Sequence, residues 1–222
     1  MDMSGVALAQ ARYWDRVANK KRFSHPLRVE WLGRCIEPQA CILDFGCGYG
    51  RTLEELVCAG YENVIGVDLS FGMLTRCRSE FTNRRLIQNN GQTIPLRRHS
   101  VDLVLVFAVL TCVPRDEDQV ALLSEVGRVL RPGGILYISD FLLNQDLRNR
   151  ERYERNPEGC GIYGTFELPE GLVVRHHRRE WIEELTRPFD RLEFEPFDVT
   201  TMNGNVSAAF QYLGRARASR SR

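Results

Sequence analysis

Residues 41–50, which read CILDFGCGYG, decide the fold, because a short apolar run there ends in three glycines at alternate positions. An apolar run of this length that leads into glycines is typical of a buried strand. An ordinary turn from a strand into a helix needs one glycine, whereas three let the chain bend sharply and let a ligand approach the backbone. The stretch therefore predicts a nucleotide-binding loop between a strand at 41–45 and a helix at 51–59.

The order of residues in this loop distinguishes between classes of nucleotide. A dinucleotide-binding loop has its third glycine one residue later, with the pyrophosphate at the helix N-terminus. Asp44, which precedes the first glycine, would repel a pyrophosphate but can accept a hydrogen bond from an ammonium group. A Walker A loop is excluded because no G-K-[ST] follows. The loop favours a nucleoside that carries an amino-acid group.

A second acid, Asp68, ends the next predicted strand, at 63–67. Parallel strands bring their carboxyl ends to one edge of a sheet, so Asp68 should lie beside the glycine loop. A carboxylate at this place can accept hydrogen bonds from both hydroxyls of a ribose. Asp68 alone could equally cap the following helix, since Asp and Ser70 are both good N-caps. Together with the glycine loop, it favours a ligand-binding role.

Strands and helices alternate along most of the chain, which is typical of a doubly wound α/β fold with a parallel sheet and helices on both faces. Apolar runs predict further strands at 86–87, 101–108, 135–141, 191–197 and 206–213, with a turn at 203–205 before the last. Helical spacing of apolar residues predicts helices over 5–36 (broken near His25-Pro26), 71–82, 117–130 and 178–186. A hairpin of short strands is predicted at 163–168 and 172–175.

The length of 222 residues suits a single α/β domain, which we expect to span residues 1–214. Residues 1–37 would form an N-terminal helical cap. Residues 143–180 begin with a polar stretch and interrupt the alternation, so they are interpreted as a lid-like insertion. Residues 215–222 are rich in arginine and serine and are predicted to be a disordered basic tail.

Composition and charge indicate a globular protein, with 43% hydrophobic residues, 27% charged residues and a net charge of +1. No apolar run approaches the roughly 20 residues that cross a bilayer, and the N-terminus has no signal-peptide pattern. We therefore expect a cytoplasmic protein without membrane contact. The seven cysteines are scattered and form no C-x-x-C pair, which argues against a disulfide framework and against a metal site.

Nucleic acid is not an expected partner, because four arginines lie in the last eight residues and the rest of the chain is near neutral to slightly acidic. A short tail of this kind is more often simply solvated. Both a monomer and a homodimer are compatible with the sequence.

Residues 40–141 resemble the class I S-adenosylmethionine-dependent methyltransferases, in particular the type 11/25-like group that acts on small molecules. The parts match in order: the glycine loop, Asp68, and the segment VGRVLRPGGILYISDF at 126–141. The resemblance implies a Rossmann-like seven-stranded sheet in the order 3-2-1-4-5-7-6, with the last strand antiparallel. It also implies S-adenosyl-L-methionine as the cofactor and S-adenosyl-L-homocysteine as the product.

The resemblance assigns cofactor contacts residue by residue. The family's first motif, which holds the methionine part, corresponds to Asp44, Gly46, Cys47, Gly48 and Gly50. Asp68 corresponds to the acid that binds the ribose, and the adenine would be contacted by Leu69, Met73, Asn90, Gly91 and Gln92. The floor of the pocket corresponds to Phe107 and Ala108. Asn90 departs from the family, in which an aspartate is common, but its amide oxygen can still accept from the adenine amine.

The acceptor side is less defined by sequence. Methyl transfer is an in-line displacement, so the protein mainly supplies alignment and exclusion of water, and a base is needed only for a protonated acceptor. The candidate proton acceptors are Asp140, His176 and His177; adjacent residues of a strand point to opposite faces, so at most one histidine faces the pocket. Alternatively, the histidines lie at a solvated strand end and Asp140 has a structural role.

The N-terminal helix offers two aromatic residues near the predicted pocket. Tyr13 is expected to close over the cofactor, although both it and Trp14 could instead only pack against the sheet. The candidate acceptor-binding residues are Trp14, Val109, Phe141 and Tyr163.

The sequence thus predicts an enzyme that transfers a methyl group from S-adenosylmethionine to an N, O, S or C atom of a small molecule. A cofactor-binding regulatory protein without transfer is an alternative from a different class. A nucleic-acid methyltransferase is a third, with the basic tail as its only support.

Overall fold

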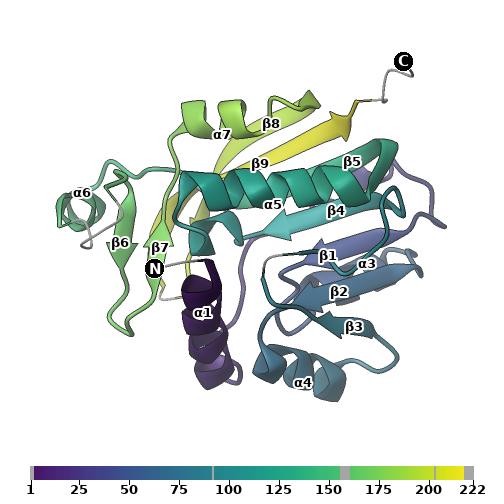
Figure 1. The fold of residues 1–222 in the computed structure, drawn as a ribbon, viewed down its shortest axis with the longest axis horizontal. Helices are drawn as coiled ribbons and strands as arrows, with labels where there is room; N and C mark the ends of the chain where they lie inside the picture. Colours follow the sequence, from purple (N-terminus) through teal and green to yellow (C-terminus); the bar gives the residue numbers. More distant parts are fainter. Residues whose placement is uncertain (1–2, 92, 156–160, 203, 218–222) are drawn as a thin grey trace.

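The computed structural model describes residues 3–91, 93–155, 161–202 and 204–217. Its main element is a seven-stranded sheet in the order β3-β2-β1-β4-β5-β9-β8 (Figure 1). The strands are β1 (Ile42–Phe45), β2 (Val64–Asp68), β3 (Arg85–Gln88), β4 (Val101–Phe107), β5 (Leu130–Phe141), β8 (Phe189–Thr200) and β9 (Val206–Ala216). The first five pair in parallel, and β9 runs antiparallel to β5 and β8. The predicted order is confirmed, because the predicted sixth and seventh strands are β8 and β9.

The helices between the parallel strands and the small hairpin follow the predicted alternation. The helices are α1 (Met3–Val17), α2 (Val29–Leu32), α3 (Arg51–Cys58), α4 (Phe71–Glu80), the 3-10 turn η1 (Leu110–Cys112), α5 (Asp116–Val129), α6 (Leu147–Glu154) and α7 (Arg179–Leu185). The predicted hairpin is confirmed, with β6 (Thr165–Glu167) antiparallel to β7 (Val173–Arg175). Among the described residues, no helix is both long enough and apolar enough to cross a membrane.

Each face of the sheet has its own apolar core, as alternation along a strand requires. Leu43 belongs to the core under α5 and α7, whereas its neighbour Ile42 belongs to the core under α2, α3 and α4. Both side chains are fully buried. Burial of one such side chain contributes about 1.5–3 kcal/mol, so the two cores fix where the strands end and the loops begin.

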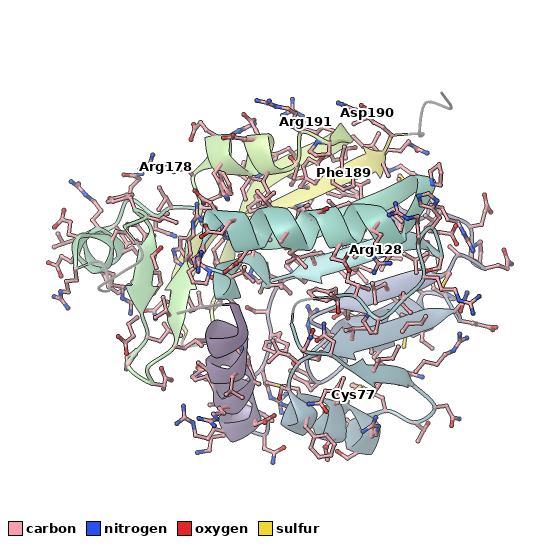
Figure 2. The ribbon with its side chains drawn as sticks, viewed as in Figure 1. Cys77, Arg128, Arg178, Phe189, Asp190 and Arg191 are labelled. Atoms are coloured by element: carbon pink, nitrogen blue, oxygen red, sulfur yellow. The ribbon has the colours of Figure 1, made fainter. Side chains whose placement is uncertain are left out.

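The loop between β3 and β4 is fixed to α5 by Arg128, which is labelled in Figure 2. Its guanidinium donates to the carbonyls of Ile94 (2.8 Å) and Leu96 (2.9 Å) and pairs with Glu125 (2.7 Å). Glu125 in turn accepts from the backbone N–H of Ile94 at 3.1 Å. This loop therefore has a defined position beside the carboxyl end of β2.

The N-terminal segment is less helical than predicted. α1 ends at Val17 and α2 has four residues, with irregular backbone between them. The backbone groups of this connection bond to other elements: Phe23 N–H donates to the Tyr49 hydroxyl, and the Pro26 carbonyl accepts from Gln211. Because these tertiary partners replace helical hydrogen bonds, a helix over 5–36 does not form.

Two further differences concern chain regions without strong local patterns. The polar stretch after Phe141 contains α6, whose N-cap is Asp146; its carboxylate accepts from the Asn149 N–H at 3.2 Å. The predicted start of the disordered tail, at residue 215, is too early. In the sheet, Arg215 pairs with Ile135 and Ala216 pairs with Phe189. The rest of that tail, 218–222, lies outside the described residues.

Candidate active site

The glycine loop bends through left-handed backbone at Gly46 (φ +76°), Gly48 (φ +54°) and Gly50 (φ +86°). Gly46 and Cys47 both donate their N–H groups to the Val67 carbonyl, at 2.7 and 3.1 Å, which fastens the loop to the end of β2. A side chain at Gly46 would collide with Val109, and one at Gly48 would collide with the ring of Phe23. The loop therefore requires glycine both for its conformation and for the space beside it.

Gly46→Ala is expected to lower the free energy of unfolding by about 2–5 kcal/mol. Left-handed backbone costs alanine about 1–2 kcal/mol, and the collision with Val109 adds an overpacking cost of about 1–3 kcal/mol. Gly60→Ala is the matched control, because Gly60 also has a positive φ (+93°) but no atom within 4 Å of the added Cβ. Urea denaturation of both variants measures the difference, and equal losses would contradict the collision.

Asp68 is held by the backbone at the end of β2. Its Oδ2 accepts from the Gly48 N–H and its Oδ1 from the Ser70 N–H, both at 2.8 Å. The side chain is buried, and burial raises its pKa to about 6 against the lowering effect of these hydrogen bonds. Through these two hydrogen bonds, the carboxylate connects the glycine loop to the start of α4.

Asp44 is a buried carboxylate whose Oδ2 has no hydrogen-bond partner within the described residues. Burial raises its pKa to about 7, and Arg51 opposes this rise. Arg51 does not neutralise Asp44 by direct pairing, because its guanidinium donates to Glu55 and to the His25 carbonyl, both at 2.5 Å. A buried acceptor without a hydrogen bond destabilises the folded protein unless a ligand donates a hydrogen bond to it.

Two adjoining cavities meet at the carboxyl ends of the parallel strands. In Figure 1 these strand ends point towards α1. The main cavity and the adjoining cavity are both lined by Gly46, Asp68, Leu69, Val109 and Cys112. The main cavity continues past Asp44 and Gly48 towards α6, while the adjoining cavity lies against Asn89, Gly91 and Leu122. Asp68 therefore stands where the two spaces join.

An aromatic wall closes the far part of the main cavity. Phe141 stacks on His176 with ring centroids 5.2 Å apart, and Phe166 meets His176 edge to face at 5.0 Å. His25 packs edge-on against Phe141 at 4.7 Å, and Trp14 and Phe23 cover the side of the glycine loop. This wall gives the cavity an apolar interior suited to a planar ligand.

Comparison with known proteins assigns the family. Residues 43–138 match the family model described as a methyltransferase domain. The chain is 33% identical over 175 residues to a ubiquinone/menaquinone biosynthesis C-methyltransferase, UbiE, of Campylobacter jejuni, with 70% of this chain and 73% of that protein covered. The chain belongs to the class I S-adenosylmethionine-dependent methyltransferases.

Other relatives agree with this methyltransferase assignment. An uncharacterized methyltransferase of Mycobacterium tuberculosis is 32% identical over 166 residues, covering 72% of this chain and 65% of that protein. A crystal structure of a S-adenosylmethionine-dependent methyltransferase from Methanosarcina mazei has the same fold, with a TM-score of 0.79, 23% identity, and coverage of 88% of this chain and all of that one.

Most of the predicted cofactor contacts of this methyltransferase lie in the two cavities. The main cavity is lined by Asp44, Gly46, Cys47, Gly48, Asp68, Leu69, Met73, Phe107 and Ala108, together with the predicted acceptor contacts Trp14, Val109 and Phe141. Gly91 lines the adjoining cavity. The sequence therefore brings together the glycine loop, both acids and the apolar floor as expected.

Four predicted contacts lie outside both linings. Tyr13 packs into an apolar cluster with Tyr153. Gly50 is the N-cap of α3, and its α-carbon faces Cys77 of α4, which is labelled in Figure 2. Asn90 is exposed, and its side-chain oxygen accepts a hydrogen bond from the Thr93 N–H. Tyr163 is 41% exposed and packs against Tyr153. Gln92 lies outside the described residues.

The structure brings one of the three predicted proton acceptors, His176, to the main cavity. Asp140 is buried behind it and accepts from the N–H groups of Thr111 (3.2 Å) and Phe141 (2.8 Å), which joins η1 to β5. His177 points away from the cavity, where Gln119 and the Phe141 carbonyl occupy its two ring nitrogens. Both are corrected to structural roles, because their polar atoms are already used within the fold.

His176 is bonded to its neighbours through Nδ1. The Tyr153 hydroxyl accepts from the Asn144 N–H (3.1 Å) and lies 2.8 Å from His176 Nδ1. The Asn144 amide nitrogen lies 3.3 Å from the same atom. Burial lowers the pKa of His176 to about 3, which favours the neutral ring. Nε2 is therefore the ring nitrogen left for a ligand in the cavity, and a role of His176 as proton acceptor stays a prediction.

Sequence reasoning missed several residues of the main cavity, notably Phe23, His25, Arg148 and Arg152. His25 is buried; its Nδ1 bonds to the Ser139 hydroxyl at 2.9 Å, and its Nε2 has no partner among the described residues. Its only sequence signal was its place before Pro26. The two arginines did carry a signal, because a spacing of four residues places them on one side of a helix.

Proposed function

We propose that this methyltransferase transfers the methyl group of S-adenosylmethionine to a small molecule bound in the main cavity. The observation that carries the proposal is that the two acids and glycine loop share one cavity with an aromatic wall built from α1, the β6–β7 hairpin and the end of β5. A cavity enclosed on these sides admits a small acceptor more readily than a polymer.

The residues present fit the cofactor at three points. The unpaired Oδ2 of Asp44 can accept from the cofactor's ammonium group, and Asp68 can accept from the ribose hydroxyls at the junction of the cavities. The apolar adjoining cavity beside Leu69 suits the adenine. When bound, the cofactor supplies a methyl group on a positively charged sulfur, which is activated for in-line displacement.

The protein's own residues then align the acceptor and exclude water. Phe23 stacks on Tyr49 with centroids 5.0 Å apart and covers Gly48, so it shields the loop from solvent. His176 Nε2, the ring nitrogen not bonded within the described part of the fold, can form a hydrogen bond with a polar group of the acceptor beside Phe141. Among N, O, S and C acceptor atoms, the similarity to a protein named as a C-methyltransferase favours carbon.

Calorimetric titration of the full-length protein with S-adenosylmethionine and S-adenosylhomocysteine tests the cofactor assignment. We expect saturable binding of both. Turnover is then followed by release of S-adenosylhomocysteine over a set of small aromatic acceptors, and carbon-13 in the transferred methyl group identifies the acceptor atom by NMR. Absence of binding at millimolar cofactor would contradict the proposal, and binding without turnover on any acceptor would favour a regulatory protein.

A further inference from the structure

Two arginines of α6 line the main cavity at its end away from the glycine loop. Arg148 and Arg152 are one helical turn apart, and Figure 1 shows α6 beyond the β6–β7 hairpin, on the side opposite β3. The acids of the cavity lining, Asp44 and Asp68, belong to the glycine-loop end. Among the described lining residues, the α6 end therefore carries positive charge only.

These arginines are incompletely neutralised by the protein. Arg152 has no carboxylate within 4.0 Å in the described ranges, and its guanidinium lies over the Phe166 ring at 5.3 Å. Among the described residues, the one carboxylate near Arg148 is that of Asp146, at a long 3.8 Å. The Asp146 carboxylate is instead occupied by Asn149, whose amide nitrogen donates to it at 2.6 Å.

The position of Arg152 has an energetic cost that a bound anion would remove. Burial and the neighbouring charge of Arg148 both lower the pKa of Arg152, so each cation disfavours the other in the free protein. Arginine binds carboxylates through two parallel hydrogen bonds, which are stronger than bonds between neutral groups. A single carboxylate placed between the two side chains would offset their repulsion.

The surface between the arginines and the reaction end of the cavity is aromatic. Phe166 lies under Arg152 and against His176, and His176 stacks on Phe141. A planar ring can pack along this wall while His176 Nε2 forms a hydrogen bond with a polar group on it. The two arginines and the aromatic surface that could hold a ring thus lie next to each other in the same cavity.

We infer that the methyl acceptor is an aromatic acid whose carboxylate is bound by Arg148 and Arg152 and whose ring packs on Phe166, His176 and Phe141. This inference rests on the proposed function, because it assigns the acceptor class of the same cavity. The carboxylate end lies away from the glycine loop, and the ring extends towards it.

Calorimetry with two probes of matched shape tests the inference. 1-Naphthylacetate carries the carboxylate, and 1-naphthylacetamide is its neutral counterpart. The intact protein is titrated with each probe, with and without saturating S-adenosylhomocysteine. We expect the acid to bind about tenfold more tightly than the amide, since hydrogen bonds to charged groups contribute this much or more.

Matched variants assign the preference to the two side chains. Arg152→Gln and Arg148→Gln are each expected to reduce the preference for the acid, and the double variant to abolish it. Arg150→Gln is the control, because Arg150 is exposed on the same helix and does not line the cavity, so it should keep the preference. Circular dichroism verifies that each variant is folded.

Equal binding of the two probes by the unsubstituted protein would overturn the inference, as would a preference that persists in the double variant. These outcomes are separate from failure of the proposed function, which would be absence of S-adenosylhomocysteine binding in the same samples. Cofactor binding without any preference for the acid would overturn the acceptor class alone.

Discussion

Protonation of Asp44 alone is expected to lower the affinity for S-adenosylmethionine about a hundredfold from about pH 8 to about pH 5, because this carboxyl must be ionised to pair with the cofactor's ammonium group. Burial raises the pKa of Asp44 from 3.8 to about 7, and the cation of Arg51 only partly opposes this. Below about pH 7 the free protein holds a proton on Asp44 that binding must release. The affinity should then fall by about tenfold for each pH unit.

The same pKa shift acts on the free protein in the opposite direction. A carboxyl whose pKa is raised in the folded state contributes stability that is complete below its ordinary pKa of 3.8. This contribution is lost as the pH rises through about 7. The free protein thus tolerates Asp44 best when it is protonated, whereas the bound form requires the carboxylate.

Isothermal titration over this pH range, in two buffers of different ionisation enthalpy, measures both the affinity and the proton released. Asp44→Asn should bind more weakly and lose the dependence above about pH 6. A residual dependence below that value is expected from Asp68, whose pKa burial raises to about 6. An affinity that does not change with pH in the unsubstituted protein would show that Asp44 does not pair with the cofactor.

The cofactor half of the site could be predicted from the sequence because its determinants are local. The glycine loop and Asp68 each directly follow a short apolar strand, and the parallel order of β1 and β2 brings those ends together. Apolar runs of this kind are buried on both faces, so the pattern itself specifies the strands. The ends of β5 and β8 were less predictable. β5 begins at Leu130, which pairs with Val101 of β4, and antiparallel pairing with β9 extends β8 through polar residues to Thr200.

The acceptor half could not be predicted in the same way. Its wall is assembled from α1, the end of β5, α6 and the hairpin, which are far apart in the chain. Alternation along a strand correctly limited the histidine pair to one residue in the cavity, but it could not choose between them. The ring orientation of His176 depends on contacts of its Nδ1 with Tyr153 and Asn144, whose positions arise only from tertiary packing.

Asp68→Ala is expected to raise the dissociation constant for S-adenosylmethionine by about a hundredfold, because two hydrogen bonds from a ribose to a charged acceptor are lost. The substitution also leaves the N–H groups of Gly48 and Ser70 without their acceptor, so the glycine loop loses its connection to α4. Asp68→Asn separates these effects, since its amide oxygen can still accept from one N–H group. It should recover much of the thermal stability but little of the affinity.

Asp15→Ala is the matched control for a local disturbance of this region. Asp15 accepts from the Ser70 hydroxyl (2.6 Å) and from the Gly72 N–H (2.8 Å), but it is exposed and lines neither cavity. Its removal should weaken the packing of α1 on α4 and leave the cofactor affinity within about twofold, since no charge-assisted ligand contact is lost. If Asp15→Ala and Asp68→Ala weaken binding equally, the loss comes from the loop and not from the ribose. An unchanged dissociation constant in Asp68→Ala would refute the ribose contact directly, because no other carboxylate lines the junction of the two cavities within the described residues.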